Sequence, residues 1–169
     1  MNTDQLLKQW YAGIRVAHIL HRLTASHYSK LHRTLGVIVV FTTTLVGTAL
    51  FATLTSSKNI YIQSGIGCIS VAAAVLSTLQ TFLGYAELSE KHKAIAVKYG
   101  ELRRELDQVL ATPQPEDSTL NDFMTSFRTR WNSIDQDAPS VPDKIYAKAQ
   151  GITSNVTGNA IDKANDEDG

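Results

Sequence analysis

Charged side chains are nearly missing from one long part of this chain. Residues 35–86 contain one charged residue, Lys58, although the whole sequence has 16 Lys and Arg and 16 Asp and Glu. Charged residues rarely avoid the surface of a soluble domain over such a length. The gap therefore argues against an ordinary soluble domain and predicts that this part of the chain lies in a membrane.

Cysteines and catalytic motifs are scarce as well. The only cysteine, Cys68, has no partner for an internal disulfide. The sequence has no phosphate-binding loop, nucleophile elbow, HExxH motif or paired carboxylates. Its net charge is zero, unlike that of a nucleic-acid-binding protein. We therefore expect no enzyme activity, no cofactor, no bound metal and no nucleic-acid partner.

Two uncharged runs are long enough to cross a bilayer. They occupy residues 35–55 and 60–86. About 20 apolar helical residues span the hydrocarbon core of a membrane, and a short connection joins only antiparallel helices. We expect a two-transmembrane helical hairpin. The alternative is a soluble bundle with these two helices at its centre.

Basic residues flank both runs on the sides that lead to the chain termini, which predicts the orientation. Because positive residues remain in the cytoplasm, both termini are expected there. The basic residues nearest the runs are Arg22, Lys30, Arg33, Lys91, Lys93 and Lys98, with Lys58 alone in the turn.

The rest of the sequence predicts helical extensions, so the expected fold class is all-α. Residues 1–34 have an apolar stripe and can continue into the first span, with Gly36 as a flexible point. Residues 87–145 combine a heptad helix, expected to continue the second span without a break, with an amphipathic helix. The acidic tail, 146–169, is expected to be mostly disordered. The apolar face of the amphipathic helix comprises Leu120, Phe123, Phe127, Trp131 and Ile134.

The heptad helix carries an apolar seam with alternating spacings of three and four. Such a seam has to be covered, either by the N-terminal helix of the same chain or by a neighbouring subunit. We therefore take it as a candidate oligomerisation seam. It comprises Leu88, Ile95, Tyr99, Leu102, Leu106 and Val109, with His92 in register.

Small and hydroxyl-bearing residues gather on one face of the second run, opposite its bulky apolar residues. A lone helix in lipid gains nothing from this sorting, so the face has to meet protein or water. It either packs closely against a helix, in an oligomer or against Thr44, Thr48 and Thr55 of the first run, or lines a pore. Gln80, at its border, is the expected cross-helix hydrogen-bonder. The face comprises Gln63, Ser70, Ala74, Ser77, Thr81 and Gly84.

Four of the five histidines lie in the N-terminal helix. His18 and His21 are close enough in sequence to share a metal, but no cysteine or carboxylate accompanies them at ligand spacing. We expect a solvated or interfacial helix face instead. The other two histidines in the helix are His27 and His32.

A series of motifs is distributed along the chain from Tyr28 onward. The segment Tyr28-Ser-Lys-Leu-His-Arg-Thr-Leu-Gly36 leads into the first run, and the second run ends in Ala74-Val-Leu-Ser-Thr-Leu-Gln-Thr-Phe82. His92-Lys-Ala-Ile-Ala-Val-Lys-Tyr99 follows, and then Arg130-Trp-Asn-Ser-Ile134 and Ala138-Pro-Ser-Val-Pro142. In order and spacing, over roughly residues 5–145, these motifs resemble the SLATT family, the SMODS- and SLOG-associating two-transmembrane effector proteins of bacteria.

The resemblance implies a pore-forming or membrane-permeabilising effector of a nucleotide-sensing, antiphage conflict system. Such proteins are thought to oligomerise in the bacterial inner membrane when a partner signals infection, causing growth arrest or cell death. The implied partners are the lipid bilayer, other copies of the chain, and a nucleotide-second-messenger synthase or sensor encoded nearby. The alternative is a non-conducting membrane scaffold whose helical extensions recruit a cytoplasmic sensor or enzyme. The family's motifs are helix-packing patterns, so no catalytic or gating residue is transferred.

Overall fold

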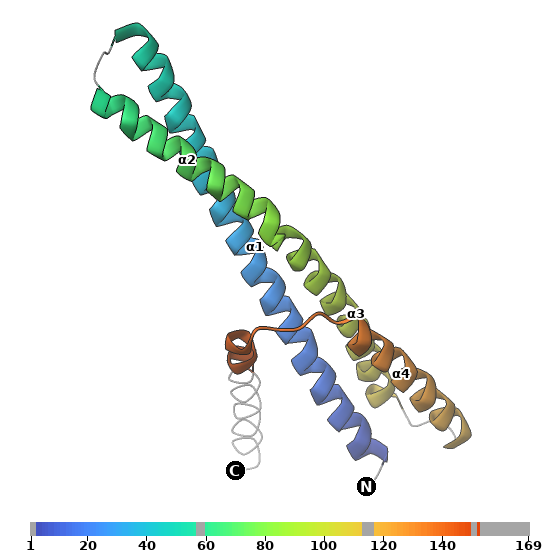
Figure 1. The fold of residues 1–169 in the computed structure, drawn as a ribbon. Coiled ribbons are helices and arrows are strands. Elements are labelled where there is room, and N and C mark those ends of the chain that lie inside the picture. Colours follow the sequence, from blue (N-terminus) through green and yellow to red (C-terminus); the bar gives the residue numbers. More distant parts are fainter. Residues whose placement is uncertain (1–2, 57–59, 113–116, 150–151, 153–169) are drawn as a thin grey trace, which may run out of the picture. The chain divides into compact units, whose positions relative to one another are not determined.

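The protein is all-α in the part of the chain that the structure, a computed structural model, describes: residues 3–56, 60–112, 117–149 and 152. Within these residues there is no strand, which confirms the expected fold class. Four long helices account for most of them (Figure 1), and a further helical segment covers 143–149. The helices are α1 (Thr3–Ser56), α2 (Ile60–Leu83), α3 (Tyr85–Ala111) and α4 (Asp117–Asp137).

α1 is a single uninterrupted helix of 54 residues. At about 1.5 Å per residue it is roughly 80 Å long. It contains no proline, the residue that most often breaks a helix, and its helical backbone passes through Gly36 without interruption. The prediction that the N-terminal helix continues into the first apolar run is therefore confirmed.

The second apolar run does not continue unbroken into the heptad helix, so that prediction is wrong. α2 ends at Leu83 and α3 begins at Tyr85, with Gly84 between them at a φ of 55°. This left-handed conformation is open to glycine because it has no Cβ to collide with the backbone. The Leu88 amide still donates to the Gly84 carbonyl, 3.0 Å away, and so begins the hydrogen bonding of α3.

Two helices are long and apolar enough to cross a membrane. In their most apolar 18-residue windows, 0% and 6% of the residues are buried. The central helices of a soluble bundle would instead be mostly covered by the chain. This exposure supports membrane association and disfavours the soluble bundle. Large apolar residues exposed on the two helices include Val40, Phe41, Val71, Val75 and Phe82.

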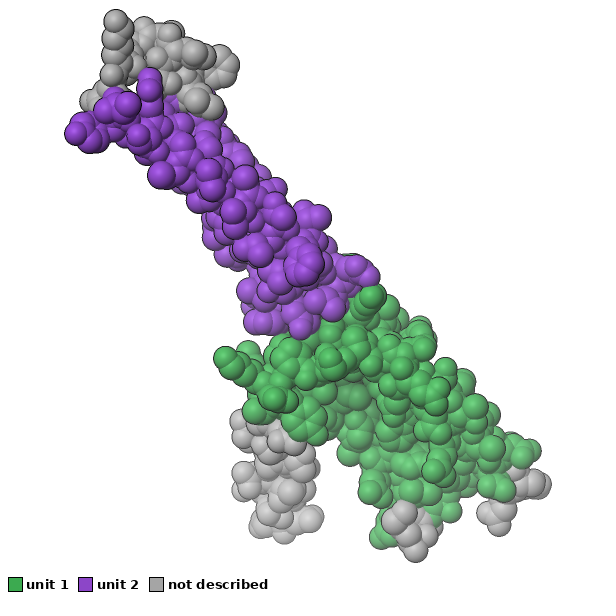
Figure 2. Space-filling model, in the orientation of Figure 1, with its two compact units in different colours: residues 1–26, 90–169 green, residues 27–89 purple. Residues whose placement is uncertain are grey.

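The chain forms two compact units (Figure 2). Unit 1 comprises residues 1–26 and 90–169, and unit 2 comprises residues 27–89. Unit 2 therefore contains both apolar runs, whereas unit 1 combines the start of the chain with the segments that follow the second run.

The core of unit 1 is built by α1, α3 and α4. Phe127 of α4 is fully buried, and its ring stacks on Trp10 of α1 with the ring centroids 5.9 Å apart. Trp131 meets the edge of Trp10 at 6.1 Å. The predicted apolar face of α4 is confirmed, since its members are either buried in this core or packed against it. The buried core residues are Leu7, Ile14, Ile95, Tyr99, Leu102, Leu106, Leu120, Phe127 and Ile134.

The segment after α4 also packs against α1. Ile145 and Ala149 form a small buried cluster with Leu20 of α1. Residues 146–149 are therefore helical, and the prediction that the disordered tail begins at residue 146 is wrong for them. An alanine or isoleucine that finds a hydrophobic partner gains enough from burial to order a short helix. Apart from Ile152, the remaining tail lies outside the described residues.

In unit 2, contacts between α1 and the α2–α3 segment bring the helices side by side (Figure 1). The rings of Tyr28 and Tyr85 stack with their centroids 5.8 Å apart. Gln80 lies against Gly36, where a Cβ would be 3.4 Å from the Gln80 Nε2 atom. Glycine thus lets the polar side chain of Gln80 approach the backbone of α1 closely.

Candidate functional site

The small and hydroxyl-bearing face of α2 is mostly uncovered within unit 2. Gln63, Ala74, Ser77 and Thr81 are exposed. The structure splits the predicted face, because its other two members, Ser70 and Gly84, are half-buried. Ala73, next to the face, is buried. α2 therefore packs through a neighbouring stripe and leaves the predicted face open. The half-buried and buried positions of α2 are Ile66, Ser70, Ala73, Leu76 and Gln80.

The hydroxyl-bearing face of the first span does not cover it. Thr44 and Thr48 are exposed, while Thr42 and Val46 on the other side of α1 are half-buried. The alternative in which the α2 face packs against these threonines within one chain is therefore wrong for Thr44 and Thr48. The side chain of Thr55 lies outside the described residues.

Hydroxyl groups of these faces donate hydrogen bonds to their own helices. Thr81 Oγ1 donates to the Ser77 carbonyl at 3.2 Å, and Ser70 Oγ to the Ile66 carbonyl at 2.8 Å. Thr44 and Thr48 donate in the same way, to carbonyls 2.8 and 2.9 Å away. A donor bonded in this way needs no other partner, but each hydroxyl oxygen can still accept a hydrogen bond.

The predicted seam of α3 is covered within the chain. Tyr99, Leu102 and Leu106 are buried in the core of unit 1, as is Ile95, and Val109 packs against that core. Leu88 is half-buried. Of the two partners that the sequence left open, the structure shows the N-terminal helix of the same chain, joined by α4.

A buried histidine pair links α1 and α3. The Nδ1 atoms of His21 and His92 are 2.9 Å apart, and both rings are buried. One Nδ1 donates and the other accepts, so two neutral rings hold opposite tautomers. The prediction of a solvated histidine face is wrong for His21. His27 is exposed, whereas His18 and His32 are half-buried.

Tyr99 and Asp135 extend this pair into a polar cluster. The His21 ring stacks on Tyr99 with the centroids 5.6 Å apart, and the Tyr99 hydroxyl donates to Asp135 Oδ1 on α4. Three helices of unit 1 thus contribute polar side chains to one connected group, in which Asp135 is exposed. We define His21, His92, Tyr99 and Asp135 as the polar cluster.

Burial shifts the pKa values of His21, His92 and Tyr99. It lowers the pKa of His21 to about 4, helped by the adjacent His92 and opposed by Asp135. Burial also lowers the pKa of His92. The pKa of Tyr99 is raised by burial and by its hydrogen bond to Asp135. Both imidazoles are therefore neutral at pH 7.

The rings of the polar cluster are closed to a substrate because His21, His92 and Tyr99 are all buried. Within the residues that the structure describes, no three His, Cys, Asp or Glu side chains lie together as metal ligands. The contacts of the polar cluster join α1, α3 and α4 within unit 1.

The spacing of residues in the sequence, rather than its composition, indicates that His21 and His92 are buried. Leu7, Ile14 and His21 are seven residues apart, as are His92, Tyr99 and Leu106. Both histidines thus occupy core positions of a heptad pattern, which predicts burial against a facing helix.

Comparison with known proteins identifies no relative of this chain: no protein-family model, no curated protein and no solved structure matches it.

Proposed function

We propose that this protein crosses the bacterial inner membrane twice, assembles with copies of itself through the exposed face of α2, and permeabilises the membrane. The observation that carries the proposal is the exposure of Gln63, Ala74, Ser77 and Thr81 on a helix long and apolar enough to span a bilayer. One chain alone would turn this face toward lipid. Small side chains let another helix approach closely, and hydroxyl and amide groups can line a water path between such helices.

The proposed topology is a hairpin with both termini in the cytoplasm. Basic residues precede the apolar part of α1 and follow α2, whereas Lys58 alone lies between the two helices. Positive residues are retained on the cytoplasmic side of the membrane. Unit 1 would then lie in the cytoplasm, where it can meet a soluble partner.

The proposed biological setting follows from the sequence resemblance to the SLATT family. In that setting, a nucleotide-second-messenger synthase or a sensor triggers the protein during phage infection. Membrane permeabilisation would then stop growth or kill the infected cell.

Leakage from liposomes tests the proposal directly. Purified protein is reconstituted into dye-loaded liposomes, and the leakage rate is compared with that of the Ser77→Leu/Thr81→Leu variant. Filling the face with bulky side chains should reduce leakage about tenfold, because a water path needs space and polar groups.

A matched variant controls for the added apolar volume. Ser64 and Ala72 are also exposed on α2, but they lie on the side of the helix that carries its bulky apolar residues. Ser64→Leu/Ala72→Leu should therefore leak like the wild type. Equal leakage from the two double variants would show that the small face does not line the path.

A non-conducting scaffold is the second candidate. It is favoured by the hydroxyl donors of Ser70 and Thr81, which are already bonded to their own helix and so tolerate a dry interface. In this case crosslinking would detect oligomers while the liposomes remain sealed, and unit 1 would recruit a cytoplasmic sensor or enzyme.

A further inference from the structure

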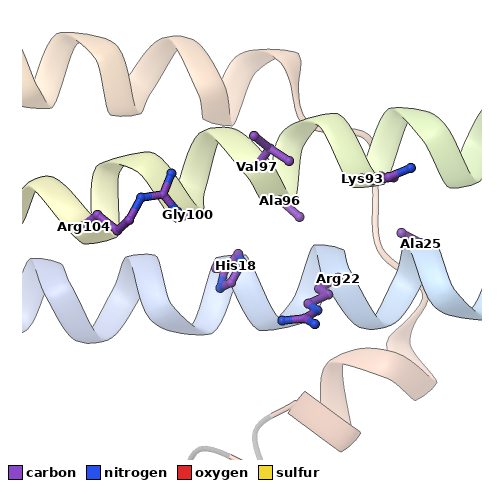
Figure 3. A pocket seen from close by; sticks show the side chains of 8 residues that line it. All are labelled: His18, Arg22, Ala25, Lys93, Ala96, Val97, Gly100 and Arg104. Atoms are coloured by element: carbon purple, nitrogen blue, oxygen red, sulfur yellow. The ribbon is translucent and has the colours of Figure 1, made fainter.

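A basic pocket opens between α1 and α3 within unit 1 (Figure 3). Its volume is about 270 Å³. Arg22 of α1 and Lys93 and Arg104 of α3 lie around it, and no carboxylate is among its lining residues. His18 of α1 points toward α3 in the same space. Three basic residues thus line one pocket, and no acidic residue is among its lining residues.

Little in the described part of the chain neutralises these cations. Neither Arg22 nor Arg104 forms an ion pair with another described residue. Lys93 approaches Glu90 one turn away, with 3.5 Å between Nζ and Oε1, but both side chains are exposed. An exposed pair of this kind contributes little and can be exchanged for a ligand.

His18 adds a polar side chain to the pocket wall. Its Nδ1 atom is buried and has no hydrogen-bond partner among the described residues. Burial lowers the pKa of His18, and the positive charges of Arg103, Arg22 and Arg104 lower it further. The neutral ring can donate one hydrogen bond to a ligand.

Small residues form the rest of the pocket. Ala25, Ala96 and Gly100 leave room between the two helices, and Val97 adds an apolar edge. A Cβ on Gly100 would lie 3.5 Å from His18 Nε2 and 3.7 Å from Arg104 Nη1. Glycine at this position therefore keeps open the space between the two polar groups.

We propose that this pocket binds a phosphate-bearing anion. Two guanidinium groups and an ammonium group suit a ligand with more than one negative charge, and the arginine fork matches two oxygens of a phosphoryl group. The alanines and Val97 can contact an uncharged part of the ligand. Soluble phosphate esters and anionic phospholipid headgroups share this chemistry. The proposal does not depend on whether the protein permeabilises membranes.

Calorimetric titration with pyrophosphate tests the pocket with the full-length protein in a neutral detergent at fixed ionic strength. The Arg22→Gln/Arg104→Gln variant should bind at least about tenfold more weakly than the wild type, because two charge-assisted contacts are lost. The control is Arg128→Gln/Lys148→Gln, which removes two exposed charges of unit 1 outside the pocket. It should retain affinity within about twofold if the contacts are specific. An equal loss in both double variants would overturn the proposal.

A third variant guards against loss of fold. Gly100→Ala places a methyl group at ordinary contact distances from His18 and Arg104, so it should fold while narrowing the pocket. It should weaken pyrophosphate binding without changing the far-UV circular dichroism spectrum. Unchanged binding in Gly100→Ala and in the pocket double variant would overturn the proposal.

Nanodiscs distinguish the two sources of phosphate. Titrations are repeated in phosphatidylcholine nanodiscs with and without phosphatidylglycerol. If anionic lipid blocks pyrophosphate binding in the wild type, and thermally stabilises it but not the pocket double variant, the headgroup is the ligand. If pyrophosphate binds equally in both nanodiscs, the ligand is a soluble phosphate ester. No pyrophosphate binding and no lipid-dependent difference between wild type and variant would overturn the proposal.

Discussion

At the scale of single residues, the most unusual feature is a pair of histidines inside a hydrophobic core. His21 and His92 are hydrogen-bonded to each other and stay neutral because burial disfavours the imidazolium form. A buried polar pair is tolerated when its hydrogen bonds are made, but it becomes costly when one partner must accept a proton.

The pair should make unit 1 sensitive to acid. Burial lowers the pKa of His21 from 6.5 to about 4, so between these values the unfolded chain binds a proton that the folded chain does not. The free energy of unfolding therefore has its full value above pH 6.5. It decreases as the pH falls toward 4, by roughly 3 kcal/mol for His21. Both tryptophans of the chain, Trp10 and Trp131, pack in unit 1, so denaturation followed by their fluorescence measures this loss.

Two variants separate the pair from other acid effects. His21→Leu/His92→Leu should make the dependence between pH 6.5 and 4 shallower, since it removes two of the three histidines whose pKa burial lowers and leaves His18. His27→Gln, at an exposed position, should retain the wild-type slope. If the leucine variant loses stability as steeply as the wild type, the pair is not the source of the acid sensitivity.

At the scale of helices, the sequence predicts well which segments form helices and which of their faces are apolar. Phe127 and Trp131 lie on the expected face of α4, because a spacing of three and four residues sorts side chains regardless of the partner. The identity of the partner is harder to predict. The residue pattern of the α3 seam is the same whether α1 and α4 or a second copy of the chain covers it. Only the tertiary structure shows which partner is present.

The break after α2 is difficult to predict for a related reason. A glycine in an apolar run is compatible with an unbroken helix that has small residues on one side and also with a helix end, and Gly84 fits both. Likewise, the exposure of Ser77 depends on which stripe of α2 packs against α1, and a shift by part of a turn leaves the hydrophobic pattern unchanged.

The conformation of Gly84 predicts a specific cost of substitution. Gly84→Ala should lower stability by about 1 kcal/mol, because a Cβ is strained at a φ of 55°. Thermal unfolding in detergent, followed by circular dichroism, measures the change. Gly47→Ala is the control, since a Cβ there meets nothing within 4 Å and alanine favours the helix. A Gly84→Ala variant as stable as Gly47→Ala would show that the turn is not strained.

At the scale of the whole molecule, the two units differ in where their apolar side chains lie. Unit 1 buries aromatic and aliphatic side chains in a core, whereas unit 2 exposes large apolar residues such as Phe41 and Phe82. Exposed apolar surface of this kind is stable in lipid and a liability in water. Membrane association, which these helices favour by length and composition, would cover a surface that is otherwise prone to aggregation.

The single native cysteine allows the environment of α2 to be probed. Cys68 is exposed on the side of α2 that carries Val75 and Leu79. In reconstituted membranes it should not react with a membrane-impermeant maleimide, because the reagent does not enter the lipid. Ala74→Cys in a Cys68→Ser background places the thiol on the small face, at comparable depth on the other side of the middle of α2. That variant should react if the face lines water, and equal reactivity at the two positions would contradict the proposed orientation.

The hydroxyl groups of Thr44, Thr48 and Thr81 have a consequence for ions. Because each donates its hydrogen to a carbonyl of its own helix, it presents only oxygen lone pairs to its surroundings. A water path bounded by such groups offers partial negative charge and few donors, so it solvates cations better than anions. These hydrogen bonds within the helix lower the cost of placing the threonines in lipid. The same hydrogen bonds would make a water path between assembled copies selective for cations.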